Sequence, residues 1–222
     1  MAKTNKIVNA KIEKFNETKH FSLVRNFHLA DFITLGNGAC GSLSIFSSMQ
    51  YLITRDETWL WRSMYFIPIG TFFDIIDGKI ARWRKNASIL GQELDSLADL
   101  ISFGVAPAVC AFAVGMRTFV DTIVLTIFIS CGIARLARYN ATVAIIPKDA
   151  SGKVNYFEGT PIPTSLIMVA TIAYLAKTGK INENLPGGVT ELFYGLSFHP
   201  FVLTYALSGT AMVSKTLKIP KF

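Results

Sequence analysis

Residues 74–99 read DIIDGKIARWRKNASILGQELDSLAD, and this stretch carries four aspartates: Asp74, Asp77, Asp95 and Asp99. The first pair is spaced by three residues and the second by four, which puts each pair on one face of a helix. A short basic turn between the pairs would let the two faces meet. Four neighbouring acids in an apolar setting are costly unless cations neutralise them. The stretch therefore predicts two helices that share a site for divalent ions.

Apolar segments lie on both sides of this motif and fill most of the chain. The sequence has 222 residues, of which 51% are hydrophobic and 17% charged, and its mean hydropathy is +0.40. Stretches of about twenty residues with few charges are typical of a polytopic membrane protein rather than of a soluble core. We expect an all-α protein with six transmembrane helices, at Ala30–Thr54, Thr58–Ile80, Leu94–Gly115, Phe119–Ala141, Pro161–Ala176 and His199–Val213.

The basic residues indicate how these helices are oriented. Seventeen of the 22 Lys and Arg residues lie in residues 1–28, the turn at 79–85, the connection at 135–153 and the C-terminal tail, against five elsewhere. Such a positive-inside bias places both termini and the acidic motif in the cytosol. The net charge of +7 is spread over these segments, so we do not expect a stripe that binds nucleic acid.

The chain divides into two parts. Residues 29–222 form one predicted membrane domain, and residues 1–28 form a basic juxtamembrane segment that mixes apolar side chains with lysines. Two interpretations of the segment remain open: a short amphipathic helix on the anionic cytosolic leaflet, and a solvated tail. The three histidines, His20, His28 and His199, are scattered, so we expect them to be solvated at the interface rather than to form a metal triad.

The ligand types of the predicted ion site suggest its chemistry. Carboxylate oxygens without Cys or His partners favour Mg²⁺ or Mn²⁺ over zinc, and we expect two such ions with a phosphate-bearing substrate. Gly78 leaves room for a ligand beside the helix, and Arg82 could contact a phosphate. In the first span, Asn37 and Thr34 are one helical turn apart. They either accompany the close packing of the neighbouring glycines or reach a polar ligand.

The motif closely resembles a known signature. Its fixed positions match the spacing of the CDP-alcohol phosphotransferase family at Asp74, Asp77, Gly78, Ala81, Arg82, Gly91, Asp95 and Asp99. The resemblance implies six transmembrane helices, usually in a homodimer. It also implies transfer of a phosphatidyl or related group from a CDP-linked donor to an alcohol, with release of CMP.

The same resemblance implies roles for the four acids. Asp74, Asp77 and Asp95 would be metal ligands. Asp99 would be a ligand, the general base for the incoming hydroxyl, or both. The head group of the CDP-linked lipid would be held by the remaining motif positions and the first span, at Gly78, Ala81, Arg82, Gly91 and Asn37.

A second group of residues bears on the acceptor alcohol. Arg135 and Arg138 are one helical turn apart and could clamp a carboxylate, and Glu158 could bind an ammonium. Serine carries both groups, so we predict a serine site from these three residues and Tyr139. The alternative is that the arginines anchor the fourth span in the cytosol and that Glu158 lies on the surface.

Four segments, Gly91–Pro107, Arg135–Asn140, Phe157–Thr164 and Ser214–Lys221, resemble the integral-membrane phosphatidylserine synthases, the fungal members in particular, and this resemblance covers roughly residues 26–222. This resemblance implies CDP-diacylglycerol and L-serine as substrates, an active site facing the cytosol and, in a eukaryote, the endoplasmic reticulum membrane. Two alternatives stay open. One is a family member that uses inositol or glycerol phosphate, and the other is a transporter in which the acids form a translocation site.

Overall fold

The computed structural model describes residues 29–84, 89–145, 156–191, 195–214 and 216–220. The amphipathic segment predicted at residues 1–28 lies outside these ranges. The helical elements are α2 (Leu29–Thr54), α3 (Glu57–Arg84), α4 (Ile89–Asp99), the π-helical turn η2 (Leu100–Val105), α5 (Ala106–Ala113), α6 (Phe119–Ile145), α7 (Ser165–Lys177) and α8 (Leu203–Val213), with short 3-10 turns η3 (Ile162–Thr164), η4 (Asn182–Asn184) and η6 (Pro200–Val202).

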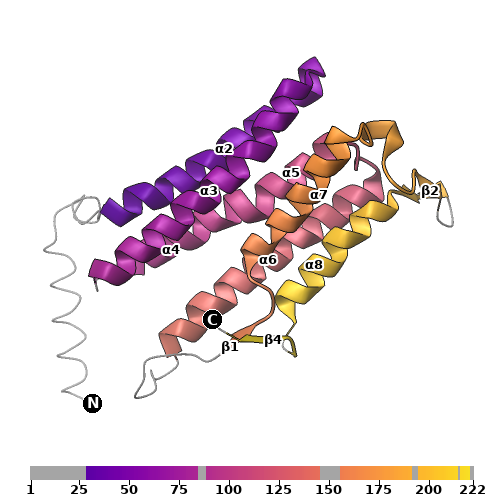
Figure 1. The fold of residues 1–222 in the computed structure, drawn as a ribbon. Coiled ribbons are helices and arrows are strands. Elements are labelled where there is room, and N and C mark those ends of the chain that lie inside the picture. Colours follow the sequence, from indigo (N-terminus) through magenta and orange to yellow (C-terminus); the bar gives the residue numbers. More distant parts are fainter. Residues whose placement is uncertain (1–28, 85–88, 146–155, 192–194, 215, 221–222) are drawn as a thin grey trace, which may run out of the picture.

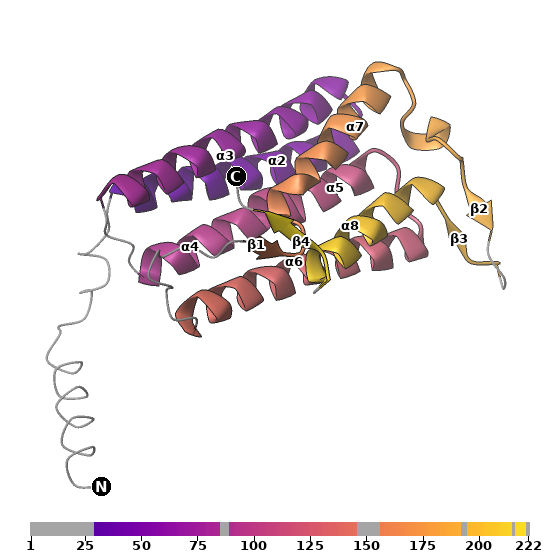
Figure 2. The ribbon, with the colours of Figure 1, turned by 60° about the horizontal axis from the view of Figure 1, so that its bottom comes forward.

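The helices form an elongated bundle in which chain neighbours run in opposite directions. Figure 1 shows α2 and α3 side by side along one flank, and α6 beside α8 on the other. The helix formed by α4, η2 and α5 lies between these two pairs and contacts α2 and α6 (Figure 2). The third predicted span is therefore the centre of the bundle.

Each stretch predicted to cross a membrane is largely helical in the structure. By length and composition, the described chain has two helical segments that could span a membrane, Leu90–Ala113 and Phe119–Ala141. Two shorter apolar helices cover Ile162–Lys177 and Pro200–Val213. The structure thus agrees with a helical membrane protein, and the count of six spans stays a prediction.

The outer surface of the α2–α3 pair is apolar, as expected for contact with lipid. Large hydrophobic side chains are exposed along both helices, among them Phe32, Phe46, Ile53, Tyr65 and Phe72. A soluble monomer rarely exposes a continuous apolar face of this kind. The buried core lies on the inner side, where α5 is almost completely enclosed.

Two details of the helices differ from the simple prediction. Helix α3 continues to Arg84, so the first half of the acidic motif is helical throughout, and Arg82 and Arg84 belong to this helix rather than to a turn. Lysine and arginine are good helix formers, which explains the extension. The third span contains the π turn η2 directly after Asp99. A π turn inserts an extra residue and changes which side of the helix faces the bundle.

Two small antiparallel sheets lie at the two ends of the bundle. Strand β1 (Tyr156–Glu158) pairs with β4 (Lys218–Pro220), which ties the connection after α6 to the end of the chain. Strand β2 (Thr190–Glu191) pairs with β3 (Ser197–Phe198) in the connection between α7 and α8. Figure 1 shows them at opposite ends.

Candidate metal centre

Three of the four motif acids meet between α3 and α4. One carboxylate oxygen from each of Asp74, Asp95 and Asp99 lies within 4.8 Å of the other two. All three residues are partly buried. Oxygen atoms at such separations, with no opposing Lys or Arg ion pair among the described residues, fit a divalent cation of the Mg²⁺ or Mn²⁺ type. The sequence prediction that the two halves of the motif meet is consistent with this geometry.

The fourth acid, Asp77, is held from another helix. Its Oδ2 accepts a hydrogen bond from the Thr34 hydroxyl on α2, with 2.6 Å between the oxygens, and Asp77 is only 4% exposed. Asp77 is not among the three acids whose oxygens converge. Its proposed role as a ligand would therefore use the carboxylate oxygen that does not face Thr34, or a small movement of the side chain.

Asn37 on α2 contacts the acid cluster directly. Its Nδ2 donates to Oδ1 of Asp99 at 3.2 Å, and Asn37 is completely buried. The backbone carbonyl of Asn37 accepts a hydrogen bond from the Ser102 hydroxyl in η2, at 2.9 Å. Helix α2 thus contacts both halves of the motif through Thr34 and Asn37, the two polar residues of the first span that the sequence analysis left between helix packing and a polar ligand.

The glycines of the motif lie beside the acids. Gly78 follows Asp77 in α3, and Gly91 precedes Asp95 by one helical turn in α4, and both glycines are partly buried. The side chains of Ala81 and Arg82 lie outside what the structure describes. Their backbone belongs to α3, so the whole first half of the motif is carried by one helix.

The residues predicted to bind the acceptor alcohol interact with several different parts of the bundle. Arg135 on α6 attracts Asp99 electrostatically, and its guanidinium lies 5.8 Å from the centre of the Tyr139 ring. Arg138, one turn further, donates through its η1 nitrogen to the carbonyl of Val213 at the end of α8, at 3.1 Å. The guanidinium of Arg138 is thus bonded to the end of α8. The side chain of Glu158 lies outside what the structure describes.

A polar cluster between α4 and α6 was not predicted. The Asn140 side chain accepts hydrogen bonds from Gln92 and Ser96, each at 3.2 Å, and its Nδ2 donates to Ser96 and, at 3.4 Å, to Glu93. These bonds fix the start of α4 against the end of α6. The only signal in the sequence was the amide residue Asn140 next to Tyr139, and an isolated amide does not indicate which residues it bonds to.

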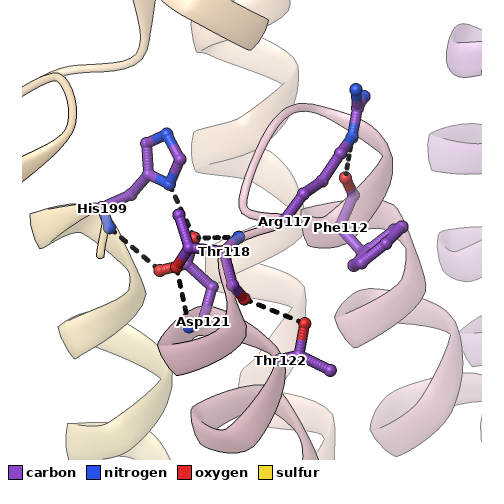
Figure 3. A network of polar contacts seen from close by, with 6 residues as sticks. All are labelled: Phe112, Arg117, Thr118, Asp121, Thr122 and His199. Atoms are coloured by element: carbon purple, nitrogen blue, oxygen red, sulfur yellow. Dashed lines mark hydrogen bonds and ion pairs between the residues drawn. The ribbon is translucent and has the colours of Figure 1, made fainter. Parts of the chain in front are cut away.

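The other end of the bundle carries a separate polar network, drawn in Figure 3. Asp121 at the start of α6 bonds to Thr118 in its own turn and to His199, which begins the last predicted span. His199 is 7% exposed. The prediction that His199 is solvated is wrong, because the Asp121 carboxylate holds the imidazole inside the bundle.

Comparison with known proteins agrees with the motif. Residues 27–209 match the family model described as CDP-alcohol phosphatidyltransferase. The chain is 49% identical to a CDP-diacylglycerol–serine O-phosphatidyltransferase of Saccharomyces cerevisiae, over 95% of this chain and 77% of the yeast protein. It is 33% identical to the Bacillus subtilis enzyme of that name, over 86% and 88% of the two chains.

A more distant relative has a related name. An archaetidylserine synthase of Methanothermobacter thermautotrophicus is 31% identical over 64% of this chain and 56% of its own. The family match covers most of the helical bundle, including the acids of α3 and α4 and the polar residues of α2. This chain therefore belongs to the CDP-alcohol phosphatidyltransferase family.

Proposed function

We propose that this protein is a phosphatidylserine synthase, which transfers the phosphatidyl group of CDP-diacylglycerol to the hydroxyl of L-serine and releases CMP. The observation that carries this proposal is the convergence of Asp74, Asp95 and Asp99 between two helices of a bundle with an apolar outer face. The names of the yeast and Bacillus relatives support the choice of serine.

The acids perform the central task in this proposal. Asp74, Asp77, Asp95 and Asp99 would hold two divalent ions, which supply positive charge for the diphosphate of the donor and for the departing CMP. Asp99 would have an additional task, since a carboxylate oxygen not engaged by a cation can accept the proton of the serine hydroxyl. Its partner Asn37 would orient that carboxylate.

The nucleotide and acceptor would be held by residues around the acids. Gly78 and Gly91 have no side chains, so a ligand can approach the helix backbone next to the acids. Ala81, Arg82 and Asn37 would complete the contacts to the CDP head group. For serine, Arg135 and Arg138 would bind the carboxylate, with Tyr139 alongside, and Glu158 would bind the ammonium. The attraction between Arg135 and Asp99 supports a serine position next to the acids.

The membrane arrangement belongs to the same proposal. Six helices would cross the bilayer with the acid cluster near the cytosolic surface, where soluble serine arrives while the acyl chains stay in lipid. The excess of Lys and Arg on that side supports this orientation. In a eukaryote the membrane would be that of the endoplasmic reticulum, and the protein would act as a homodimer.

A CMP-release assay tests the proposal. The full chain, reconstituted in vesicles with CDP-diacylglycerol and Mg²⁺ or Mn²⁺, is given L-serine, inositol or glycerol 3-phosphate in separate reactions. We expect CMP release with serine, formation of phosphatidylserine, and loss of both after chelation of the metal, with recovery when metal is returned.

The controls separate the rival functions. Release with inositol or glycerol 3-phosphate but not with serine would keep the reaction class and overturn the acceptor. Absence of CMP release with every alcohol, in protein that is folded and metal-replete, would overturn the reaction class. The transporter alternative then requires metal flux across the same vesicles.

A further inference from the structure

Two side chains of α2 are buried against the acid cluster. Thr34 is 4% exposed and Asn37 is completely buried, and they are one helical turn apart. Thr34 contacts Asp77, from the first half of the motif, and Asn37 contacts Asp99, from the second half. A helix outside the motif therefore holds one acid of each half.

The Thr34 hydroxyl has two acceptors within reach. These are Oδ2 of Asp77, at 2.6 Å, and the carbonyl oxygen of Ala30 one turn back in α2, at 3.1 Å. A hydroxyl has a single hydrogen, and a bond to a carboxylate is the shorter and stronger of the two. The hydroxyl consequently orients one oxygen of Asp77 toward α2.

The charge of Asp99 selects one orientation of the Asn37 amide. A methyl group placed on Gly70 would lie 2.9 Å from Oδ1 of Asn37, which shows how closely α3 approaches it. Turning the amide by half a rotation would point its oxygen at the Asp99 carboxylate and replace attraction with repulsion. The Ser102 hydroxyl fixes the backbone at the same residue. The geometry thus leaves Nδ2 directed at Asp99.

We propose that Thr34 and Asn37 are positioning residues that set the orientation of Asp77 and Asp99 for binding divalent cations. The inference rests on the proposed function in that it takes the acids to be ion ligands. It assigns Asn37 a task that needs no nucleotide, in addition to its proposed contact with the CDP head group. Hydrogen bonds from outer residues to ligating carboxylates typically change metal affinity 10–100-fold, about the effect expected here.

The test measures Mn²⁺ binding without any substrate. The full chain in nanodiscs is titrated with Mn²⁺, and free Mn²⁺ is followed by electron paramagnetic resonance. The variants are Thr34→Val, which keeps the shape and loses the hydroxyl, Thr34→Ser, which restores the hydroxyl, and Asn37→Leu. Ser47→Ala is the matched control, because Ser47 is a buried hydroxyl of α2 that bonds only to its own helix, at Leu43.

We expect Mn²⁺ affinity to fall about 10-fold or more in Thr34→Val and Asn37→Leu, with Thr34→Ser and Ser47→Ala within about threefold of the wild type. Unchanged affinity in Thr34→Val and in folded Asn37→Leu would overturn the inference. Equal loss in Thr34→Ser and Thr34→Val would also overturn it, because the hydroxyl would then not matter. If Asn37→Leu does not fold, the comparison of Thr34→Val with Thr34→Ser still tests the inference.

The outcome is distinguishable from failure of the proposed function. Wild-type protein that binds Mn²⁺ but releases no CMP with any alcohol would contradict the function and leave the positioning test intact. Wild-type protein that releases CMP, with variants that bind Mn²⁺ normally, would contradict the positioning role alone. A residue that contacts only the nucleotide would not change Mn²⁺ affinity in this nucleotide-free measurement.

Discussion

His199 and Asp121 are joined inside the end of the bundle opposite the acid cluster, where Nδ1 of the imidazole lies 2.6 Å from Oδ2 of the carboxylate (Figure 3). The same carboxylate accepts the backbone N–H groups of His199, at 2.9 Å, and Thr118, at 3.1 Å. The Thr118 hydroxyl in turn accepts the N–H of Asp121 at 3.1 Å. This reciprocal pair is a capping box that begins α6.

We expect Asp121→Ala to reduce stability strongly. The substitution removes a buried carboxylate that accepts three hydrogen bonds, and each buried donor left without a partner costs about 1–3 kcal/mol. The loss should be several kcal/mol, seen as a lower midpoint of thermal unfolding in detergent. His199→Ala should lose less, because the two backbone donors keep their acceptor.

A neighbouring threonine gives the control for this prediction. Thr122 is exposed and its hydroxyl bonds only to the carbonyl of Thr118 in its own helix. Thr122→Ala should leave the midpoint close to that of the wild type. Equal midpoints for Asp121→Ala and Thr122→Ala would contradict a stabilising role for the buried pair.

We expect Gly41→Ala to disturb the acid cluster from a distance. The added methyl group would lie 2.6 Å from the hydroxyl oxygen of Ser102 and 2.8 Å from its Cα, so α2 and η2 would have to separate. Such overpacking costs about 1–3 kcal/mol, and it would move Asn37, to which Ser102 is bonded. Both the unfolding midpoint and the rate of CMP release should fall.

Another glycine of α2 serves as the comparison. A methyl group on Gly38 would lie 3.5 Å from Cβ of Ala98, which is an ordinary contact. Gly38→Ala should therefore be tolerated in both measurements. A larger effect of Gly38→Ala than of Gly41→Ala would show that the close approach of α2 to the π turn is not what matters.

We expect Asp95→Asn to abolish most activity without unfolding the protein. The amide keeps the size of the side chain but has no negative charge and a weaker oxygen ligand for a hard cation. CMP release should fall by more than about 100-fold, beyond the usual effect of outer residues. Glu93→Gln removes the same charge from an exposed position of α4 and should have little effect. Normal turnover by Asp95→Asn would remove it from the ligand set.

The general plan of the molecule could be predicted from the sequence because it depends on local patterns. Apolar length locates the helices, and the helical spacing of Asp74, Asp95 and Asp99 indicates which faces carry the acids. The structure brings together these three of the four acids that were predicted to share a site. Both signals are local: the apolar stretches are about twenty residues long, and the four acids lie within residues 74–99.

Contacts between segments could not be predicted in the same way. The bonds from Thr34 to Asp77 and from His199 to Asp121 join residues 43 and 78 positions apart. They depend on how each helix is rotated about its axis, and the π turn after Asp99 changes that rotation within the third span. Hydropathy does not encode such a rotation, so polar pairs between helices were missed.

We expect Gly159→Ala to detach the loop before α7 from the end of α8. Gly159 has a positive φ of 77°, and an added methyl group would lie 2.3 Å from the carbonyl oxygen of Met212. The N–H groups of Gly159 and Thr160 bond to Leu217 and Ala211, so the loop is docked there. The substitution combines conformational strain with a backbone clash, and the unfolding midpoint should fall clearly.

Gly179 separates these two causes. Its φ is also positive, at 70°, but nothing lies within 4 Å of an added methyl group. Gly179→Ala should therefore show the conformational strain alone, about 1–2 kcal/mol. If both variants lose the same stability, the clash with Met212 contributes nothing and the loop is not tightly docked.

The two arginines of α6 should differ in what they do. Arg135 attracts Asp99, whereas Arg138 bonds to the carbonyl of Val213 at the end of α8. We expect Arg135→Ala to raise the KM for serine more than the KM for CDP-diacylglycerol, because the proposed clamp on the serine carboxylate loses one of its two cations. Arg138→Ala should raise the serine KM and also lower the unfolding midpoint, since it removes a bond between helices. Equal changes in both KM values for Arg135→Ala would contradict the proposed carboxylate site.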